Sequence, residues 1–130
     1  MTKMPIVLAD DEPYVRSLIK RILTSQGFFV VLEAQDGLDA FAIIQELNDK
    51  VSLLVTDVGM PRLDGASLCR KVKETFPSIP VLLMSGHPEP EASGSDAFLR
   101  KPSQFHLLPS VVSDLCNETT KVAQTTTTDL

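Results

Sequence analysis

Five short apolar runs recur along the chain. They lie at residues 6–8, 28–32, 53–56, 81–84 and 97–99. Brief and almost unbroken apolar runs are typical of strands that are buried on both faces, as in a parallel sheet. A strand with one solvated face would instead alternate apolar and polar residues. The pattern therefore predicts five short strands in one parallel sheet.

Between these runs, apolar residues recur at the spacing of a helix. The first such stretch has apolar residues at positions i, i+3, i+4, i+7 and i+8, namely Val15, Leu18, Ile19, Ile22 and Leu23. We expect these side chains to face the core. Asp11 is placed to act as the N-cap, Pro13 falls in the first turn, and Gly27 follows the last turn as a C′ residue would. The stretch predicts an amphipathic helix between the first two strands.

Three further stretches show the same helical spacing. Their apolar positions are Ala40, Ile43, Ile44 and Leu47; Ala66, Cys69, Val72 and Phe76, between Asp64-Gly65 and Pro77; and Leu107, Leu108, Val111, Val112 and Leu115. Strands and helices thus alternate along most of the chain. This order is typical of an α/β fold, a doubly wound five-stranded parallel sheet flanked by helices (flavodoxin-like), with right-handed crossovers.

One connection is too short for this pattern. Only residues 86–95 lie between Ser85, which follows the fourth run, and Asp96, which precedes the fifth, whereas a parallel crossover usually takes a dozen or more residues. As a helix, this segment would rise only about 15 Å, and it contains Pro88 and Pro90, which disfavour a helix interior. An extended segment of the same length could span roughly 33 Å. We therefore expect the helix between the fourth and fifth strands to be shortened or missing.

Length and composition indicate one soluble domain. The chain has 130 residues, of which 43% are apolar and 22% charged, and no apolar run is long enough to span a bilayer. The N-terminal residues lack the long apolar stretch of a signal peptide. We expect a cytoplasmic protein with one folded domain over residues 1–116 and a disordered, Thr-rich tail over residues 117–130.

Charge and cysteine content argue against several other kinds of site. The net charge is −5 and the basic residues form only small clusters, so direct nucleic-acid binding is not expected. No membrane association is expected either. Cys69 and Cys116 stand far apart on apolar helix faces, and we interpret them as buried, reduced thiols. His87 and His106 lack the close Cys/His spacing of a zinc site.

Polar residues follow four of the predicted strands. Asp10 and Asp11 follow the first, Asp57 the third, Ser85 the fourth and Lys101 the fifth. In a doubly wound sheet, functional groups collect at the carboxyl ends of the strands. Clustered carboxylates repel one another and need a cation, and hard oxygen ligands favour Mg²⁺. A lysine suited to phosphate and a hydroxyl donor complete a site equipped for phosphoryl transfer to a carboxylate.

Plainer interpretations of these residues also stand. Asp10 and Asp11 could serve only to cap the first helix, although the polar ends of the other strands favour a metal site. Ser85 could simply end its strand. Lys101 and Pro102 could form a solvated turn.

Four segments of the chain occur together at the ends of predicted strands. They are IVLADDEP (6–13), LLVTDVGMPRLDG (53–65), VLLMSG (81–86) and FLRKP (98–102). With these segments in this order, the chain resembles the receiver domain of bacterial two-component response regulators. The resemblance covers residues 5–116. Each segment alone is weak evidence for this family, whereas the four segments together are highly specific for it.

The resemblance implies a role for each acidic position. Asp57 would accept a phosphoryl group from the phosphohistidine of a histidine kinase. Asp11, Asp57 and the backbone carbonyl of Gly59 would bind Mg²⁺ directly, with Asp10 assisting through water. These assignments follow from the family pattern and not from spacing alone.

The resemblance also implies roles on the last two strands. Lys101 would pair with the phosphoryl group, and its peptide bond to Pro102 is usually cis in the family. Ser85 would turn toward the phosphate. Phe98 occupies the aromatic position whose rotamer follows that movement, although a strand aromatic is most often an ordinary core residue.

Two further positions concern hydrolysis of the phosphoryl group. His87 matches a family position that lies near this group and influences its loss, although an exposed loop histidine is the plainer interpretation. Gly59 has no side chain to place or block an attacking water. The lifetime of the phosphorylated state therefore stays open.

The leading hypothesis is a phosphoacceptor module of a two-component phosphorelay. A sensor histidine kinase or phosphotransfer protein would supply the phosphoryl group, and the chain would catalyse its own Mg²⁺-dependent phosphorylation and slow dephosphorylation, switching contacts with a downstream protein. The alternative is a degenerate receiver that binds partners without phosphorylation. An aspartyl phosphatase fits poorly, because Gly59 stands where that class has a second Asp. A single-domain protein and a piece of a hybrid kinase fit equally well.

Overall fold

The computed structural model describes residues 5–25, 30–88 and 94–116. Within these ranges the elements are β1 (Pro5–Ala9), α1 (Pro13–Thr24), β2 (Val30–Ala34), α2 (Gly37–Leu47), η1 (Asn48–Lys50), β3 (Leu53–Asp57), α3 (Gly65–Thr75), β4 (Val81–Ser85), β5 (Ala97–Arg100) and η2 (Phe105–Leu107). Residues 108–116 are also helical and are referred to below as the C-terminal helix. All five predicted strands are present in the predicted order.

The five strands form one parallel sheet in the order β2-β1-β3-β4-β5. The order steps outward from β1 in both directions, which is the doubly wound arrangement. Because every strand runs the same way, the carboxyl ends of β1, β3, β4 and β5 lie along one edge of the sheet. The predicted fold class is confirmed.

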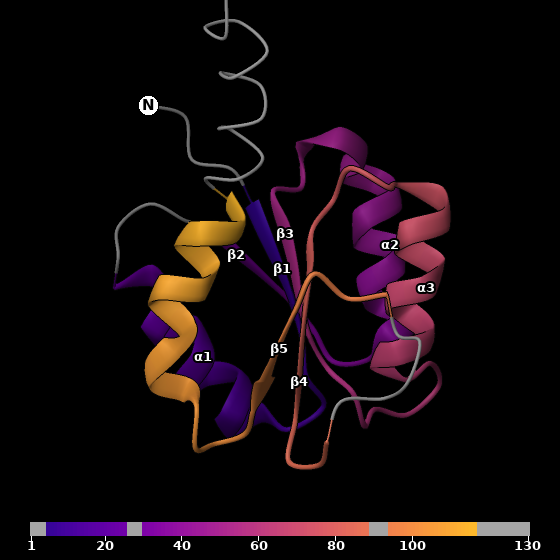
Figure 1. Cartoon of the computed structure of the whole chain (residues 1–130). Coiled ribbons are helices and arrows are strands. Elements are labelled where there is room, and N and C mark those ends of the chain that lie inside the picture. The colour runs from indigo at the N-terminus through magenta and orange to yellow at the C-terminus, as the bar shows by residue number, and fades with distance from the viewer. Residues whose placement is uncertain (1–4, 26–29, 89–93, 117–130) are drawn as a thin grey trace, which may run out of the picture.

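Helices cover both faces of the sheet (Figure 1). Helix α1 and the C-terminal helix lie on one face, and α2 and α3 lie on the other. Alternate residues of each strand contribute to the two layers, so Ile6 and Leu8 pack toward α1 while Val7 and Ala9 pack toward α2 and α3. Every residue of β3 and of β4 is buried, which fits the run of large apolar residues with which each strand begins.

Helix α1 differs from its prediction in two details. Its N-cap is Glu12 and not Asp11, and Pro13 takes the first helical position. The prediction was wrong because the residues after β1 form a local turn, in which the Glu12 N–H donates to the Asp10 carboxylate at 2.9 Å. Leu18 was expected to face the core but is 45% exposed, because α1 packs through Ile19 and its neighbours and Leu18 lies at the margin of the apolar stripe. The predicted role of Gly27 lies outside the described residues.

The connection between β4 and β5 contains no helix in its described parts, residues 86–88 and 94–96. The prediction for residues 89–93 lies outside the described ranges, as does the predicted tail over 117–130. Asp96 holds the start of β5 in place. Its carboxylate accepts the Val81 N–H at 2.7 Å and pairs with Lys73 Nζ at 2.6 Å, which joins β5 to β4 and α3.

The other helix ends and the cysteines follow the sequence closely. Asp36 caps α2 and Asp64 caps α3, each carboxylate accepting a backbone N–H three residues on. Neither cysteine forms a disulfide; Cys69 is buried as predicted, whereas Cys116 is only partly buried. In the described ranges, no helix combines the length and apolar character needed to cross a membrane.

Candidate functional site

Four acidic side chains meet at the carboxyl edge of the sheet. Asp10, Asp11 and Glu12 lie in the loop between β1 and α1, and Asp57 is the last residue of β3. One carboxylate oxygen from each residue lies within 4.8 Å of the others. Asp10 and Asp57 are buried, whereas Asp11 and Glu12 are exposed. The buried pair therefore forms the floor of the cluster and the exposed pair its rim.

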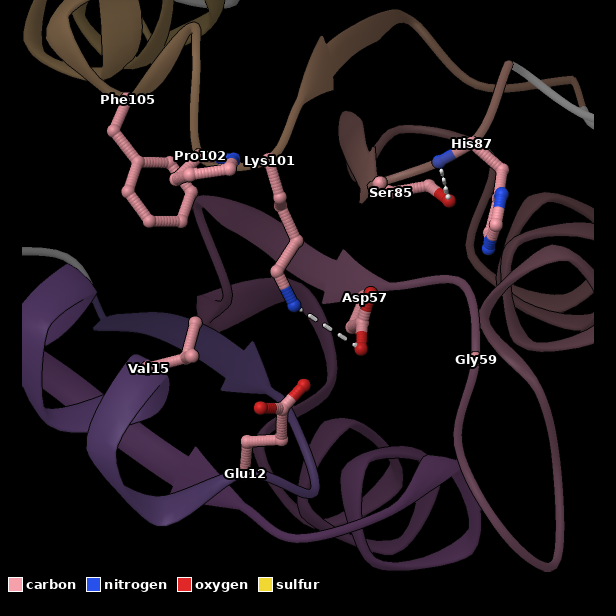
Figure 2. Close-up of a pocket in the computed structure, with 10 residues that line it drawn as sticks. Glu12, Val15, Asp57, Gly59, Ser85, His87, Lys101, Pro102 and Phe105 are labelled. Atoms are coloured by element: carbon pink, nitrogen blue, oxygen red, sulfur yellow. Dashed lines mark hydrogen bonds and ion pairs between the residues drawn. The ribbon is translucent and has the colours of Figure 1, made fainter.

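Lys101 supplies positive charge to this cluster. It follows β5, and its Nζ lies 3.1 Å from Asp10 Oδ2 and 3.3 Å from Asp57 Oδ2. Figure 2 shows the side chain reaching from the end of β5 toward Asp57, with the Glu12 carboxylate facing the same space. The Lys101 side chain is only 11% exposed, so its ammonium group is held against the acids and not in bulk water.

Burial and mutual contact shift the pKa values of Asp57 and Lys101. Burial raises the pKa of Asp57 above its ordinary value, and the Asp10 charge adds to this rise while Lys101 opposes it. Burial disfavours the charged form of Lys101, but the Asp10 and Asp57 carboxylates outweigh this effect and raise its pKa. Lys101 therefore stays protonated, and its single positive charge is shared by Asp10 and Asp57 in a cluster of four acidic side chains.

Backbone contacts fix the direction of Asp57. The Val58 N–H donates to Asp57 Oδ1 at 3.0 Å, and the Gly65 N–H donates to the Val58 carbonyl at 2.7 Å. A Cβ at Gly65 would lie 2.0 Å from the Asp57 carbonyl oxygen. Only glycine therefore allows α3 to begin so close to the end of β3. This close approach sets the path of the loop that carries Gly59.

An open pocket of about 440 Å³ adjoins the cluster. Its lining residues are Glu12, Val15, Asp57, Gly59, Ser85, Gly86, His87, Lys101, Pro102 and Phe105. Figure 2 shows Asp57, Ser85 and Lys101 at the ends of strands, and Val15 and Phe105 on the neighbouring helical segments. The peptide bond between Lys101 and Pro102 is cis, as the resemblance implied. The pocket gives a reactant access to Asp57 and Lys101 together.

The structure places the remaining predicted residues as follows. Ser85 is buried in the pocket wall, where its Oγ accepts the His87 N–H at 3.0 Å. The His87 side chain is exposed at the rim. Gly59 is also exposed, and no atom lies within 4 Å of a Cβ built there. Phe98 does not line the pocket and is partly buried against the core beneath α2 and α3.

Sequence reasoning missed two residues of this site. Glu12 joins the acidic cluster, and the acidic run DDE was a signal for it. Arg16 donates from Nη1 to the Asp10 carbonyl at 2.7 Å. No sequence signal pointed to Arg16, because an arginine in the first turns of a helix is ordinarily a solvated residue.

The donor set fits a hard cation. Every group in the cluster is a carboxylate oxygen, which is the ligand type that Mg²⁺ and Ca²⁺ prefer. The predicted Mg²⁺ ligands Asp10, Asp11 and Asp57 are all members, and Gly59 lies two residues beyond Asp57. The protein thus has an acidic cluster that could bind a metal ion.

Comparison with known proteins places this chain in a family. The family model for the response regulator receiver domain matches residues 6–113. The chain belongs to the response regulator receiver domain family. This receiver domain is 34% identical over 116 residues to the sensor kinase CckA of Brucella abortus, covering 85% of the chain and 12% of that kinase. It is 35% identical over 105 residues to the response regulator MprA of Mycobacterium avium, covering 76% of the chain and 45% of that regulator. The chain therefore spans less than half the length of either relative.

Solved receiver domains have the same fold. The receiver domain of the hybrid histidine kinase CckA is 35% identical, with a TM-score of 0.74 over 86% of this chain and 98% of that domain. The signal receiver domain of NarL from Mycobacterium tuberculosis is 30% identical, with a TM-score of 0.80 over 90% of this chain and 98% of that domain. The likeness therefore extends over nearly the whole of each receiver domain.

Proposed function

We propose that this receiver domain is the phosphoacceptor of a two-component phosphorelay, with Asp57 as the residue that takes the phosphoryl group. The observation that carries the proposal is the contact of one lysine with two buried carboxylates beside an open pocket. Burying an ion pair removes both charges from water, and this desolvation penalty can exceed their mutual attraction, so the pair is weak evidence for a role in stability alone. Its position at the pocket floor favours a chemical role.

The chemistry is a displacement at phosphorus. A carboxylate oxygen of Asp57 attacks the phosphorus of a phosphohistidine, the P–O bond forms, and the P–N bond breaks with its electron pair going to the imidazole nitrogen. Val58 N–H holds the other carboxylate oxygen and so orients the nucleophile. The Lys101 ammonium neutralises charge that gathers on the phosphoryl oxygens.

The metal in this proposal is Mg²⁺. Asp11, Asp57 and the Gly59 carbonyl would hold it directly, and Asp10 would act through water. When bound, the ion would supply charge neutralisation for the phosphoryl oxygens. Asp10 meanwhile holds Lys101 in position through the contact at 3.1 Å.

Four further roles belong to the proposal. Ser85 lies in the pocket wall and accepts the His87 N–H, and its hydroxyl would turn to donate to a phosphoryl oxygen. Phe98, on the neighbouring strand, would change rotamer with that movement. Gly59 and His87, at the open rim, would tune the access of water to the phosphoryl group.

The proposed donor is a sensor histidine kinase or phosphotransfer protein in the cytoplasm, and the output is a change in contacts with a downstream protein. The similarity to CckA, which is named a sensor kinase, supports a kinase donor.

The test exposes the protein to Mg²⁺ and a small phosphodonor such as acetyl phosphate, and follows its intact mass. Asp57→Asn removes the nucleophile. Asp64→Asn is the matched control, because Asp64 lies in the loop that follows Asp57 and an asparagine there still caps α3. We expect the mass of one phosphoryl group to appear in the unmodified protein and in Asp64→Asn, only with Mg²⁺, and not in Asp57→Asn.

Two results would overturn the proposal. A folded protein that gains no phosphoryl group under any donor and Mg²⁺ concentration would favour a phosphorylation-independent binding module. A gain of mass that persists in Asp57→Asn would place the modification on another residue.

A further inference from the structure

Arg16 joins the acidic loop to the edge of the sheet. Its Nη1 donates to the Asp10 carbonyl at 2.7 Å, and its Nε donates to Glu33 Oε1 of β2 at 3.1 Å. The side chain is only 19% exposed. The guanidinium therefore links the loop after β1 to strand β2 through one hydrogen bond at each side. We call these two hydrogen bonds of Arg16 the brace.

The brace acts on the peptide that connects Asp10 to Asp11. The Asp10 carbonyl and the Asp11 N–H share one planar peptide unit, so holding that carbonyl fixes the start of Asp11 as well. The Asp10 N–H donates to the Ala34 carbonyl at 3.1 Å. Both backbone polar groups of Asp10 are thus tied to β2, one directly and one through Arg16 and Glu33.

Orientation matters more here than at most loops. Asp10, Asp11 and Glu12 are consecutive, and their carboxylates converge only if the backbone torsions between them are held. The positive charge of Arg16, taken alone, would weaken metal binding. A guanidinium beside an acidic cluster repels a metal ion, so a purely electrostatic view predicts tighter metal binding when Arg16 is removed.

We propose that Arg16 is a positioning residue for the metal site, which sets the directions of the Asp10 and Asp11 carboxylates by holding the peptide between them to Glu33. This proposal rests on the Mg²⁺ site of the proposed function. It deepens that function by naming a residue that is neither a proposed metal ligand nor a proposed contact of the phosphoryl group.

The experiment measures the dissociation constant for Mg²⁺ by NMR titration of the amide signals of the full chain. Arg16→Gln removes the brace and the charge, whereas Arg16→Lys keeps the charge but cannot bond to both partners from one planar group. Lys20→Gln is the matched control, because Lys20 Nζ also pairs with Glu33, at 3.2 Å, and makes no contact with Asp10 in the described structure. Urea unfolding of each variant reports any loss of stability separately.

We expect the dissociation constant to rise about tenfold in Arg16→Gln, as for other residues that orient metal ligands, and to rise clearly in Arg16→Lys. Lys20→Gln should bind Mg²⁺ as the unmodified protein does. A merely structural role would lower the urea midpoint of the Arg16 variants and leave the dissociation constant of the folded protein unchanged.

The outcomes separate this inference from the function beneath it. Unchanged or tighter Mg²⁺ binding in Arg16→Gln, full recovery in Arg16→Lys, or equal weakening in Lys20→Gln would each overturn the positioning role and leave the metal site intact. Absence of Mg²⁺ binding by the unmodified chain would overturn the metal site, and the positioning role with it.

Discussion

Lys101 Nζ lies 3.1 Å from Asp10 Oδ2, although 91 positions separate the two residues along the chain. The strands that carry them, β5 and β1, are not neighbours, because β3 and β4 lie between them in the sheet. The lysine side chain therefore reaches across the ends of two strands and meets Asp57 on the way. The Lys101 ammonium group thus joins the carboxyl ends of β5, β3 and β1 by ion pairs.

Removing that cation should cost stability. In Lys101→Met, the buried carboxylates of Asp10 and Asp57 lose their shared partner, and we expect the free energy of unfolding to fall by about 3 kcal/mol in metal-free buffer. Lys20→Met is the control, because Lys20 is 44% exposed and its pair with Glu33 contributes only about 0–1 kcal/mol. Urea unfolding measures both. Equal losses in the two variants would show that the Lys101 contacts are no stronger than a surface ion pair.

Two glycines beside Asp57 should respond differently to the same substitution. Gly65→Ala places a Cβ against the Asp57 carbonyl oxygen, so α3 or the loop must shift, and we expect a loss of about 1–3 kcal/mol together with slower phosphorylation. Gly59→Ala meets no atom within 4 Å and should change stability by less than about 0.5 kcal/mol. Urea unfolding and the intact-mass assay check both variants. A Gly65→Ala protein as stable and reactive as Gly59→Ala would contradict the close packing described here.

The ion pair between Arg62 and Asp36 should make stability depend on pH. Arg62 donates to both carboxylate oxygens, at 2.8 and 3.0 Å, and lowers the pKa of Asp36 below its ordinary value of 3.8. A pKa lowered by folding stabilises the protein above the ordinary value, and that contribution is lost as the pH falls through the lowered pKa. Arg62→Gln should therefore be less stable than the unmodified protein at neutral pH.

The difference between Arg62→Gln and the unmodified protein should stay constant down to the ordinary carboxyl pKa and shrink in more acidic solution. Glutamine keeps a side chain at this position of positive φ (68°), so backbone strain is unchanged. Urea midpoints over a pH series measure the difference. A difference that does not change with pH would mean that Arg62 acts through packing and not through the Asp36 charge.

The open space at Gly59 allows a test of hydrolysis. An amide near the phosphoryl group can orient an attacking water, so we expect Gly59→Gln to shorten the lifetime of phosphorylated Asp57 severalfold. Gly59→Ala adds no polar group and should leave the lifetime nearly unchanged. Intact mass, followed after removal of the phosphodonor, gives both lifetimes. Equal lifetimes in the two variants would argue against a role for this position.

The fold could be predicted closely from the apolar pattern. Strands buried on both faces are apolar along most of their length, so the runs at 53–56 and 81–84 indicated β3 and β4 directly. The meeting of Asp57 with Lys101 followed from the parallel order, because carboxyl ends share one edge. The roles of these residues in phosphoryl transfer stay predictions.

Details that depend on tertiary contacts could not be predicted. The N-cap of α1 moved from Asp11 to Glu12 because a backbone N–H there bonds to the Asp10 carboxylate. Arg16 reaches Glu33, a residue on another strand, and no local pattern marks such a pair. Leu18 has helical spacing yet is 45% exposed. The spacing predicts the direction in which a side chain points, whereas its exposure depends on how far the packed part of the sheet extends beneath it.

The most direct test of the central claim uses beryllofluoride, a phosphate mimic, because its binding depends neither on the reactivity of a donor nor on the lifetime of a phosphorylated state. With Mg²⁺ and beryllofluoride together, we expect the amide signals of Asp57, Ser85 and Lys101 to move to new positions that neither reagent produces alone, and we expect no such change in Asp57→Asn. If the signals of the folded, unmodified protein stay where they are in Mg²⁺ alone, the claim that this pocket is built to put a phosphoryl group on Asp57 is wrong.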